Sequence, residues 1–549
     1  MIYAILRRFV VVCGVLSCSL MLAACGGSGG GSSGAPTPPP TGGGGGGGGS
    51  GPTWTAGVYQ AASVFKDRCQ VVRTGVDIEG TPFPDIAGST LQENFWLRSW
   101  TDETYLWNNE VVDQNPALFN NRLAYFAVLK TNATTPSGKD KDEFHFSQPT
   151  DEYLEQRNSA PVSGYGASFV LFSAAPPRDI RVQYTEPGSP AAQEIMGLAN
   201  FVRGAKILEI DGVDAVNANS QAAVDALNNG LFPATAGEMH TFRVEDPGQA
   251  PRTVMITSAD VAPAAVNRTA VIDTPTGKVG YILLNTFNTF ASEQELANAI
   301  AAMKAAGVSD LVLDLRYNGG GFLAVAAQLG FMVAGDGPTA GQTFEALRFN
   351  ADAGNFDPVN GGINDPIPFI DTGVGFSLPN GTPLQSLDLN RVFILSTGET
   401  CSASEAVING LRGVDVEVIL IGSRTCGKPF GFYPEDNCGE TYFTVQFQGV
   451  NDKGFGDYAD GFIANNSTAA FGVRLPGCAF ADDYENELGD ETEGLLAAAL
   501  QYRAAGTCPS PAVAVSGITA SAAKDEPTPL GQSPGMYVMR HNRDMRMPE

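Results

Sequence analysis

The stretch from Val392 to Phe432 constrains the fold more than any other part of this sequence. An apolar run, Val392–Leu395, predicts a buried strand, and a turn of small residues follows it. Apolar residues then recur at helical spacing as far as Gly413, and a second apolar run, Val416–Ile421, predicts the next strand. A strand, a helix and a strand in this order are typical of an α/β fold.

Two residues at the ends of these elements could together carry out acyl transfer. Ser402 stands at the predicted start of the helix, and Lys428 lies just beyond the second strand. A serine hydroxyl is a weak nucleophile unless a neighbouring base takes its proton. Lysine can be that base only when its amine is neutral, which requires apolar burial that Ile421, Phe430 and Phe432 could supply. The N–H of Ala403, at the helix start, is a candidate oxyanion donor.

Other interpretations of these residues stay open. Ser402 with Glu405 three residues later matches a capping box, and a lone lysine is usually solvated. The run from Gly422 to Lys428, GSRTCGK, also resembles a phosphate-binding loop. However, Pro429 stands where that loop requires a serine or threonine, so nucleotide binding is disfavoured.

A second strand–turn–helix pattern lies upstream. Val279–Leu284 and Leu311–Leu315 predict buried strands on either side of a helix. The second strand runs into Arg316 and then into a turn that contains Gly320 and Gly321. Glycines in such a turn can expose backbone N–H groups to an oxyanion, or they can simply permit a tight turn.

The charge of the chain excludes one class of partner. Asp and Glu number 59 against 33 Lys and Arg, which gives a formal net charge of -26. Nucleic-acid binding requires a basic face, so we expect no nucleic-acid partner.

The first residues are typical of a targeting segment. Arg7 and Arg8 precede an apolar stretch, and Leu22-Ala23-Ala24-Cys25 then resembles a bacterial lipobox. The resemblance implies cleavage before Cys25, lipidation of its thiol and attachment to a membrane of the cell envelope. We expect an outer-membrane destination, facing the periplasm or the cell surface. An ordinary secretory peptide is the alternative.

Six cysteines remain after the signal peptide and the lipidated residue are set aside. In an exported protein an even number favours disulfides, whose pairing the sequence leaves open. Their spacing fits no zinc pattern, so no metal and no cofactor is expected. The six are Cys69, Cys401, Cys426, Cys438, Cys478 and Cys508.

The β-rich segment 161–262 looks like a bacterial PDZ domain. Glu186–Ala192 is similar to the usual G-S-P-A-A turn, and Arg203–Gly212 is similar to the G-D-x-I-L-x-I-N-G strand. PDZ domains bind peptide C-termini by adding a strand to a sheet edge. The resemblance implies a weakly matched peptide-binding loop at Gly164, Tyr165 and Gly166. A small β domain without a ligand is the alternative.

Three further motifs, in this order, resemble the C-terminal processing (tail-specific) serine peptidases. They are D-L-R-x-N-x-G-G at Asp314–Gly321, S-A-S-E at Ser402–Glu405 and G-K at Gly427–Lys428. The resemblance implies an α/β, crotonase-like protease core and polypeptide substrates. It assigns the nucleophile to Ser402, the general base to Lys428, the oxyanion donors to Gly320 and Ala403, and support of the glycine turn to Arg316. Gly321 belongs to the same turn.

The resemblance has departures and leaves a second function open. Pro429 and Phe432 stand where many members have glycine and a lysine-orienting glutamine, and Cys401 replaces a small residue. The alternative to a lipid-anchored Ser/Lys endopeptidase, which could select substrates by their C-termini, is a non-catalytic peptide- or ligand-binding lipoprotein of the same fold. The oligomeric state is left open.

The expected organisation has six parts. They are a signal peptide (1–24), a Gly/Pro-rich tether (25–53), an N-terminal helical domain (54–160), the PDZ-like domain (161–262), the crotonase-like core (263–508) and a disordered tail (509–549).

Overall fold

The structure is a computed structural model that describes residues 51–158, 160–509, 527–530 and 543–544. The predicted signal peptide, the lipidation site at Cys25 and nearly all of the tether lie outside the described residues. Among the helices within the described ranges, none combines the length and the hydropathy that crossing a bilayer requires.

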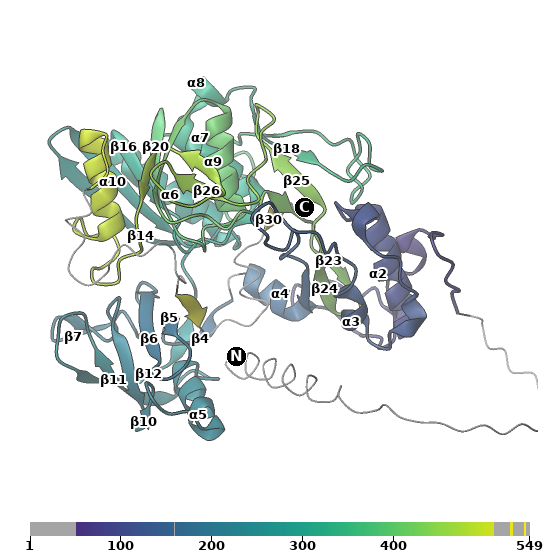
Figure 1. Ribbon diagram of the computed structural model, residues 1–549, viewed down its shortest axis with the longest axis horizontal. Helices are drawn as coiled ribbons and strands as arrows, with labels where there is room; N and C mark the ends of the chain where they lie inside the picture. Colours follow the sequence, from purple (N-terminus) through teal and green to yellow (C-terminus); the bar gives the residue numbers. More distant parts are fainter. Residues whose placement is uncertain (1–50, 159, 510–526, 531–542, 545–549) are drawn as a thin grey trace, which may run out of the picture.

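A six-stranded sheet forms the centre of the core (Figure 1). β14 and β15 are antiparallel, and every later neighbouring pair is parallel. The order across the sheet is β14 (Val266–Thr274), β15 (Gly277–Leu284), β16 (Asp310–Asp314), β20 (Arg391–Ser396), β21 (Glu417–Gly422) and β28 (Gly477–Ala479). The apolar runs noted in the sequence are four of these strands, β15, β16, β20 and β21, which are almost wholly buried.

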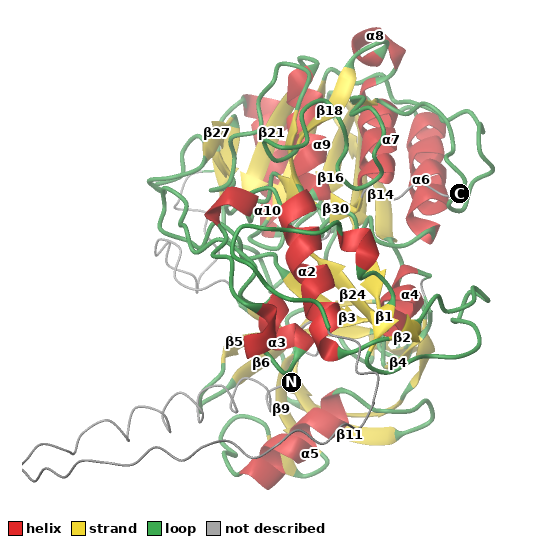
Figure 2. Cartoon of the chain, turned by 90° about the vertical axis from the view of Figure 1, so that its right-hand side faces the viewer, coloured by secondary structure: helices red, strands yellow, loops and turns green. Residues whose placement is uncertain are grey.

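Helices cover both faces of this sheet. Alternate strand residues point to opposite faces, so Ile282 and Ile394 pack with α6, α7 and α9, whereas Tyr281 and Phe393 pack with α10. Figure 2 shows α6, α7 and α9 next to one another over the strands. This arrangement confirms the predicted α/β class. The helices are α6 (Ala291–Ala306), α7 (Leu323–Ala334), α9 (Ala403–Gly413) and α10 (Gly494–Ala505).

Short elements connect and extend the core. They are β17 (Gly321–Phe322), α8 (Asp336–Thr339), β18 (Thr343–Arg348), β19 (Ile367–Pro368), β22 (Phe430–Gly431), β23 (Glu435–Asn437), β24 (Glu440–Phe443), β25 (Phe447–Val450), β26 (Phe462–Ala464) and β27 (Val473–Leu475).

A second sheet, of seven strands, lies apart from the core in Figure 1 and has the order β12, β11, β9, β6, β5, β29, with β10 paired to β9. We call these strands together with α5 the small β unit. Whether it is a PDZ domain stays a prediction. Its elements from the segment predicted to be β-rich are β5 (Ala167–Ser173), β6 (Asp179–Thr185), β9 (Lys206–Ile210), β10 (Val213–Asp214), α5 (Gln221–Leu231), β11 (Met239–Glu245) and β12 (Arg252–Thr257). The pairs β4 (Val162–Gly164) with β13 (Ala259–Val261) and β7 (Glu194–Ile195) with β8 (Leu198–Ala199) adjoin it.

The C-terminal tail contributes two strands that the sequence did not predict. β29 (Thr528–Leu530) pairs with β5, and β30 (Arg543–Asp544) pairs with β17. The expectation of a disordered tail therefore does not hold for these five residues. Composition shows that the tail cannot bury a core of its own, but it carries no information about sheet edges elsewhere in the chain.

The N-terminal segment is tied to the core by pairing and by a disulfide. β3 (Phe146–Pro149) extends the β23–β24 hairpin, and Cys69 forms a disulfide with Cys438. Long irregular stretches separate its helices, so a helical domain here stays a prediction. Its other elements are β1 (Arg68–Cys69), β2 (Ile86–Ala87), α2 (Thr90–Thr104), α3 (Arg122–Phe126) and α4 (Thr150–Arg157).

Candidate active site

Ser402 occupies an elbow between β20 and α9. Its backbone has φ 58° and ψ -111°, a conformation that residues other than glycine rarely adopt. The residue is fully buried. Its Oγ faces the N–H of Glu405 in a capping-box arrangement but makes no hydrogen bond within the described part of the chain. A strained backbone and a buried, unpaired hydroxyl are typical of a nucleophile elbow rather than of a capping serine.

The glycine turn lies directly against this elbow. The carbonyl oxygen of Asn318 accepts the N–H of Cys401 at 3.0 Å and the hydroxyl of Ser404 at 2.9 Å. The residue before Ser402 and the residue two positions after it are therefore bound to the turn after β16. The structure thus brings together two motifs that are far apart in the sequence.

The family resemblance assigned one oxyanion donor to the N–H of Gly320, but in the structure this N–H is already hydrogen-bonded. The N–H of Gly320 donates to Oδ1 of Asn318 at 2.9 Å, so this group is already engaged. The N–H of Ala403 has no acceptor inside α9, because it belongs to the first helical residue. Gly321 has φ 135°, and an added Cβ would lie 2.2 Å from the carbonyl carbon of Phe287. Only glycine fits at this position.

Glu405 joins the elbow to the turn that carries the lysine. Its Oε2 accepts the N–H of Ser402 at 3.1 Å and the N–H of Lys428 at 2.7 Å. Its Oε1 accepts the N–H of Gly427 at 2.9 Å and the hydroxyl of Thr425 at 2.5 Å. The backbones of Ser402 and Lys428 therefore meet at one carboxylate oxygen.

The Glu405 carboxylate does cap α9, because it accepts the N–H of Ser402. A cap does not explain why it also accepts the N–H groups of Gly427 and Lys428. Burial raises the pKa of Glu405, and the hydrogen bonds from Thr425 and the backbone oppose that rise. The sequence motif contained this residue, but nothing in the sequence linked it to Lys428.

Lys428 is buried between aromatic rings. The residue has no exposed surface, and its Nζ lies 4.4 Å from the ring centre of Phe432 and 4.7 Å from that of Phe144. Phe432, which replaces the usual glutamine, therefore packs on the lysine. Phe144 comes from the N-terminal segment and was not predicted to be near the site.

The disulfide between Cys401 and Cys426 fixes the same two loops covalently. One cysteine directly precedes Ser402, and the other lies two residues before Lys428. The pairing could not be chosen from the sequence. The third pair, Cys478–Cys508, joins β28 to the chain after α10.

Replacing Cys401 and Cys426 by serine is expected to lower kcat/KM for a cleaved peptide by about tenfold, because the elbow and the lysine turn lose a constraint on their geometry. The pair Cys478→Ser and Cys508→Ser is the matched control, since the two disulfides close loops of similar length, 25 and 30 residues. Each double variant should lose about 2–4 kcal/mol of stability. Equal losses of activity in both would contradict a local role for Cys401–Cys426.

Arg316, directly before the glycine turn, is held in a buried network of carboxylates. It is fully buried and bonds to Asp314 at 2.9 Å, Asp482 at 2.7 Å and Glu493 at 2.8 Å. Burial would lower the pKa of Arg316, but the three carboxylates outweigh it and raise that pKa. Its carbonyl oxygen also accepts the hydroxyl of Thr397, in the loop before the elbow.

The three residues of the predicted peptide-binding loop form the turn into β5. Gly164 pairs with Ala259, and the Tyr165 side chain is buried with its hydroxyl donating to the Gly230 carbonyl at 2.8 Å. Gly166 has φ 71°. Because the Tyr165 side chain belongs to the core of the small β unit, only the backbone of this loop could contact a peptide.

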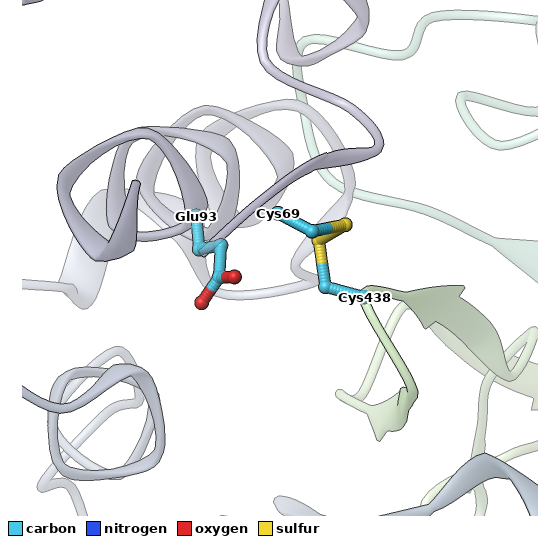
Figure 3. Close-up of side chains that lie close together, drawn as sticks. All are labelled: Cys69, Glu93 and Cys438. Carbon is cyan, nitrogen blue, oxygen red and sulfur yellow. A yellow bond between two sulfur atoms is a disulfide. The ribbon is translucent and has the colours of Figure 1, made fainter. Parts of the chain in front are cut away.

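Two clusters of acidic and cysteine residues in the described part of the chain have ligand-like spacing. They are Cys401, Glu405 and Cys426, and Cys69, Glu93 and Cys438. Figure 3 shows the second cluster, in which the two cysteines form a disulfide beside the Glu93 carboxylate. Disulfide sulfurs lack the thiolate that metal ions prefer, so the disulfides account for both clusters.

Comparisons with known proteins match the core. Residues 278–432 match the model of Peptidase family S41. The chain is 27% identical over 355 residues to the chloroplastic C-terminal processing peptidase of Tetradesmus obliquus. That match covers 62% of this chain and 65% of the relative, which is less than two thirds of its length.

A solved structure has the same fold. An S41 protease of Bacteroides fragilis is 23% identical, with a TM-score of 0.56, and the match covers 77% of this chain and 98% of that one. At this identity the likeness concerns the fold alone. The predicted resemblance is confirmed for an S41 domain and for homology to C-terminal processing peptidases. The PDZ-like domain and the lipoprotein form stay predictions.

Proposed function

We propose that this chain, whose residues 278–432 form a Peptidase family S41 domain, is a serine endopeptidase that cleaves polypeptides through an acyl-enzyme on Ser402. One observation carries the proposal. The Glu405 carboxylate accepts the N–H groups of both Ser402 and Lys428, so that a buried hydroxyl without a partner and a buried lysine belong to one site. A serine that only caps a helix and a lysine exposed to solvent would not be expected to share one buried carboxylate as hydrogen-bond acceptor.

In the proposed mechanism Lys428 acts as the general base. It accepts the proton of the Ser402 hydroxyl while Oγ attacks the scissile carbonyl, and it then returns that proton to the leaving amine. A water molecule, deprotonated by the same lysine, then attacks the acyl carbon, and the lysine returns that proton to the Ser402 Oγ as the bond to the acyl group breaks. Burial disfavours a charged amine, and the site needs the neutral form.

The tetrahedral intermediate carries a negative charge that backbone donors must stabilise. We assign these donors to the N–H groups of Ala403 and Gly321, because that of Gly320 is bonded to Asn318. Gly321 follows the engaged residue directly. The turn is held in place by backbone hydrogen bonds from the Phe287 N–H to the Gly320 carbonyl at 2.8 Å and from the Phe322 N–H to the Phe287 carbonyl at 3.1 Å.

The location and the substrate selection belong to the same proposal. The lipobox-like sequence at Cys25 and the glycine-rich tether favour an enzyme held at a membrane of the cell envelope. The edge of the small β unit could select polypeptides by strand addition at or near their C-termini.

Cleavage of a library of unstructured peptides by wild type and by Lys428→Met tests the proposal. Methionine keeps most of the apolar stem between Phe144 and Phe432 but has no amine, so the variant should fold and should lose at least about 10³-fold in kcat/KM. Mass spectrometry of the new termini is the measurement. A wild type that binds peptides but produces no new termini would favour the non-catalytic receptor instead.

A further inference from the structure

The two strands of the C-terminal tail lie at the two places that a peptide substrate would need. β30 pairs in parallel with β17, with Arg543 opposite Gly321 and Asp544 opposite Phe322. β30 also lies against β22, which begins two residues after Lys428. The tail backbone thus lies between the strand that contains Gly321 and the strand that follows the lysine.

The other tail strand occupies the free edge of the small β unit. β29 is antiparallel to β5, with Thr528 opposite Leu171 and Leu530 opposite Phe169. The chain therefore runs along β5 toward the turn at residues 164–166. Leu530 packs against the apolar core of this unit, whereas Thr528 is exposed. Backbone pairing together with one buried apolar side chain is the usual mode of peptide recognition by strand addition.

We infer that the two tail strands, β29 and β30, act together as an intramolecular peptide ligand that occupies the substrate-binding edges of the site and inhibits cleavage of other peptides. The inference rests on the proposed function, because a peptide bound to the edge of β17 can inhibit cleavage only if Ser402 is the nucleophile. A substrate that adds to β17 must displace β30, because a strand edge pairs with one partner at a time.

The covalent linkage of the tail and its charge both favour its binding to these strand edges. A segment tethered by a short chain has an effective concentration of about a millimolar, so even weak pairing keeps the edges filled. The segment 538–547, VMRHNRDMRM, holds three arginines and one aspartate in a chain whose net charge is -26. A basic peptide is attracted to an acidic protein, and this attraction weakens as salt is added.

The test compares the full chain with a chain that ends at Ser510, which retains the Cys478–Cys508 disulfide. Removal of the tail is expected to raise kcat/KM for a reference peptide by about tenfold, because the competing ligand is gone. Full-length Leu530→Asp should give part of this rise, since it places a charge where Leu530 packs on the small β unit. Thr528→Asp is the matched control, because it adds the same charge to the same strand at an exposed position, and it should raise the rate clearly less than Leu530→Asp does.

A binding measurement separates this inference from the proposed function. A fluorescent synthetic peptide of residues 526–549 is titrated into the shortened chain that carries Ser402→Ala, and anisotropy is read at two salt concentrations. Saturable binding that weakens with salt, together with the rise in rate, supports the inference.

Two results would overturn the inference while leaving the peptidase intact. The first is an equal rate for the full and shortened chains. The second is a peptide that binds the shortened Ser402→Ala chain but, when added to the active shortened chain, leaves its rate unchanged. If the peptide binds but no form of the protein cleaves any peptide, the tail is a ligand of this edge and the proposed function fails instead. Should the shortened chain not fold, the pair Leu530→Asp and Thr528→Asp decides the question, and equal rates in both would refute it.

Discussion

Ser402→Ala should remove peptide cleavage and leave the protein at least as stable as the wild type. Within the described residues the Ser402 hydroxyl is buried and makes no hydrogen bond, so its removal breaks none. A buried polar group without a partner costs free energy, and replacing it by a methyl group is neutral or stabilising. Loss of the nucleophile should lower kcat/KM by at least about 10³-fold.

Ser404→Ala is the matched control for this prediction. Ser404 lies two residues further along the same helix and is equally buried, but its hydroxyl donates to the Asn318 carbonyl at 2.9 Å. Its loss should lower the free energy of unfolding by about 0.5–1.5 kcal/mol and weaken the contact between α9 and the glycine turn. Urea unfolding and peptide kinetics on both variants are the measurements. A destabilised Ser402→Ala, or an active one, would show that Ser402 is a structural cap.

The fold of the core could be predicted because its strands are buried on both faces. The runs Val279–Leu284 and Val416–Ile421 correspond to β15 and β21 to within two residues, and α9 ends at Gly413 as expected. A parallel sheet covered by helices on both sides requires such continuous apolar strands. The tail strands could not be predicted, because two or three residues that pair with a distant edge leave no periodic pattern.

Within the site, the sequence predicted the residue types but not their connections. Ser402, Lys428 and the glycine turn were found from local motifs, each of which sits next to a predicted strand. The role of Glu405 depends on three backbone N–H groups from two loops, and that of Phe144 depends on the packing of the N-terminal segment. The bonds of Glu405 to Gly427 and Lys428, and the contact of Phe144 with Lys428, join residues more than twenty positions apart, so spacing along the chain does not reveal them.

Arg316→Met is expected to cause the largest loss of stability of any single change considered for this protein. Arg316 is the shared partner of the buried carboxylates of Asp314 and Glu493 and of the nearly buried carboxylate of Asp482. Removing one partner of a buried ion pair leaves uncompensated charge in the interior, which costs about 3–5 kcal/mol. Because the same residue supports the glycine turn, kcat/KM should also fall in the fraction that remains folded. The free energy of unfolding in urea at pH 7 is the measurement.

Arg391→Met provides the comparison, because Arg391 bonds to Asp310 at 2.6 Å but its side chain is 36% exposed. Asp310 also keeps its bond to Arg503, so the loss should not exceed about 1 kcal/mol. A similar loss in both variants would contradict the role of the buried network.

The pH dependence of the free energy of unfolding tests the contribution of the carboxylates to the same network. Burial would raise the pKa of Asp482, but Arg203 and Arg316 outweigh it and hold that pKa below its ordinary value of 3.8. In the wild type this contribution to stability is present above pH 3.8 and is lost as the pH falls through the lower folded value. Without Arg316 the unpaired carboxylates take up protons at higher pH, and their charge then no longer destabilises the fold. The difference in stability between wild type and Arg316→Met should therefore shrink from pH 7 to pH 4, and a difference that stays constant would show that lost packing, rather than charge, is responsible.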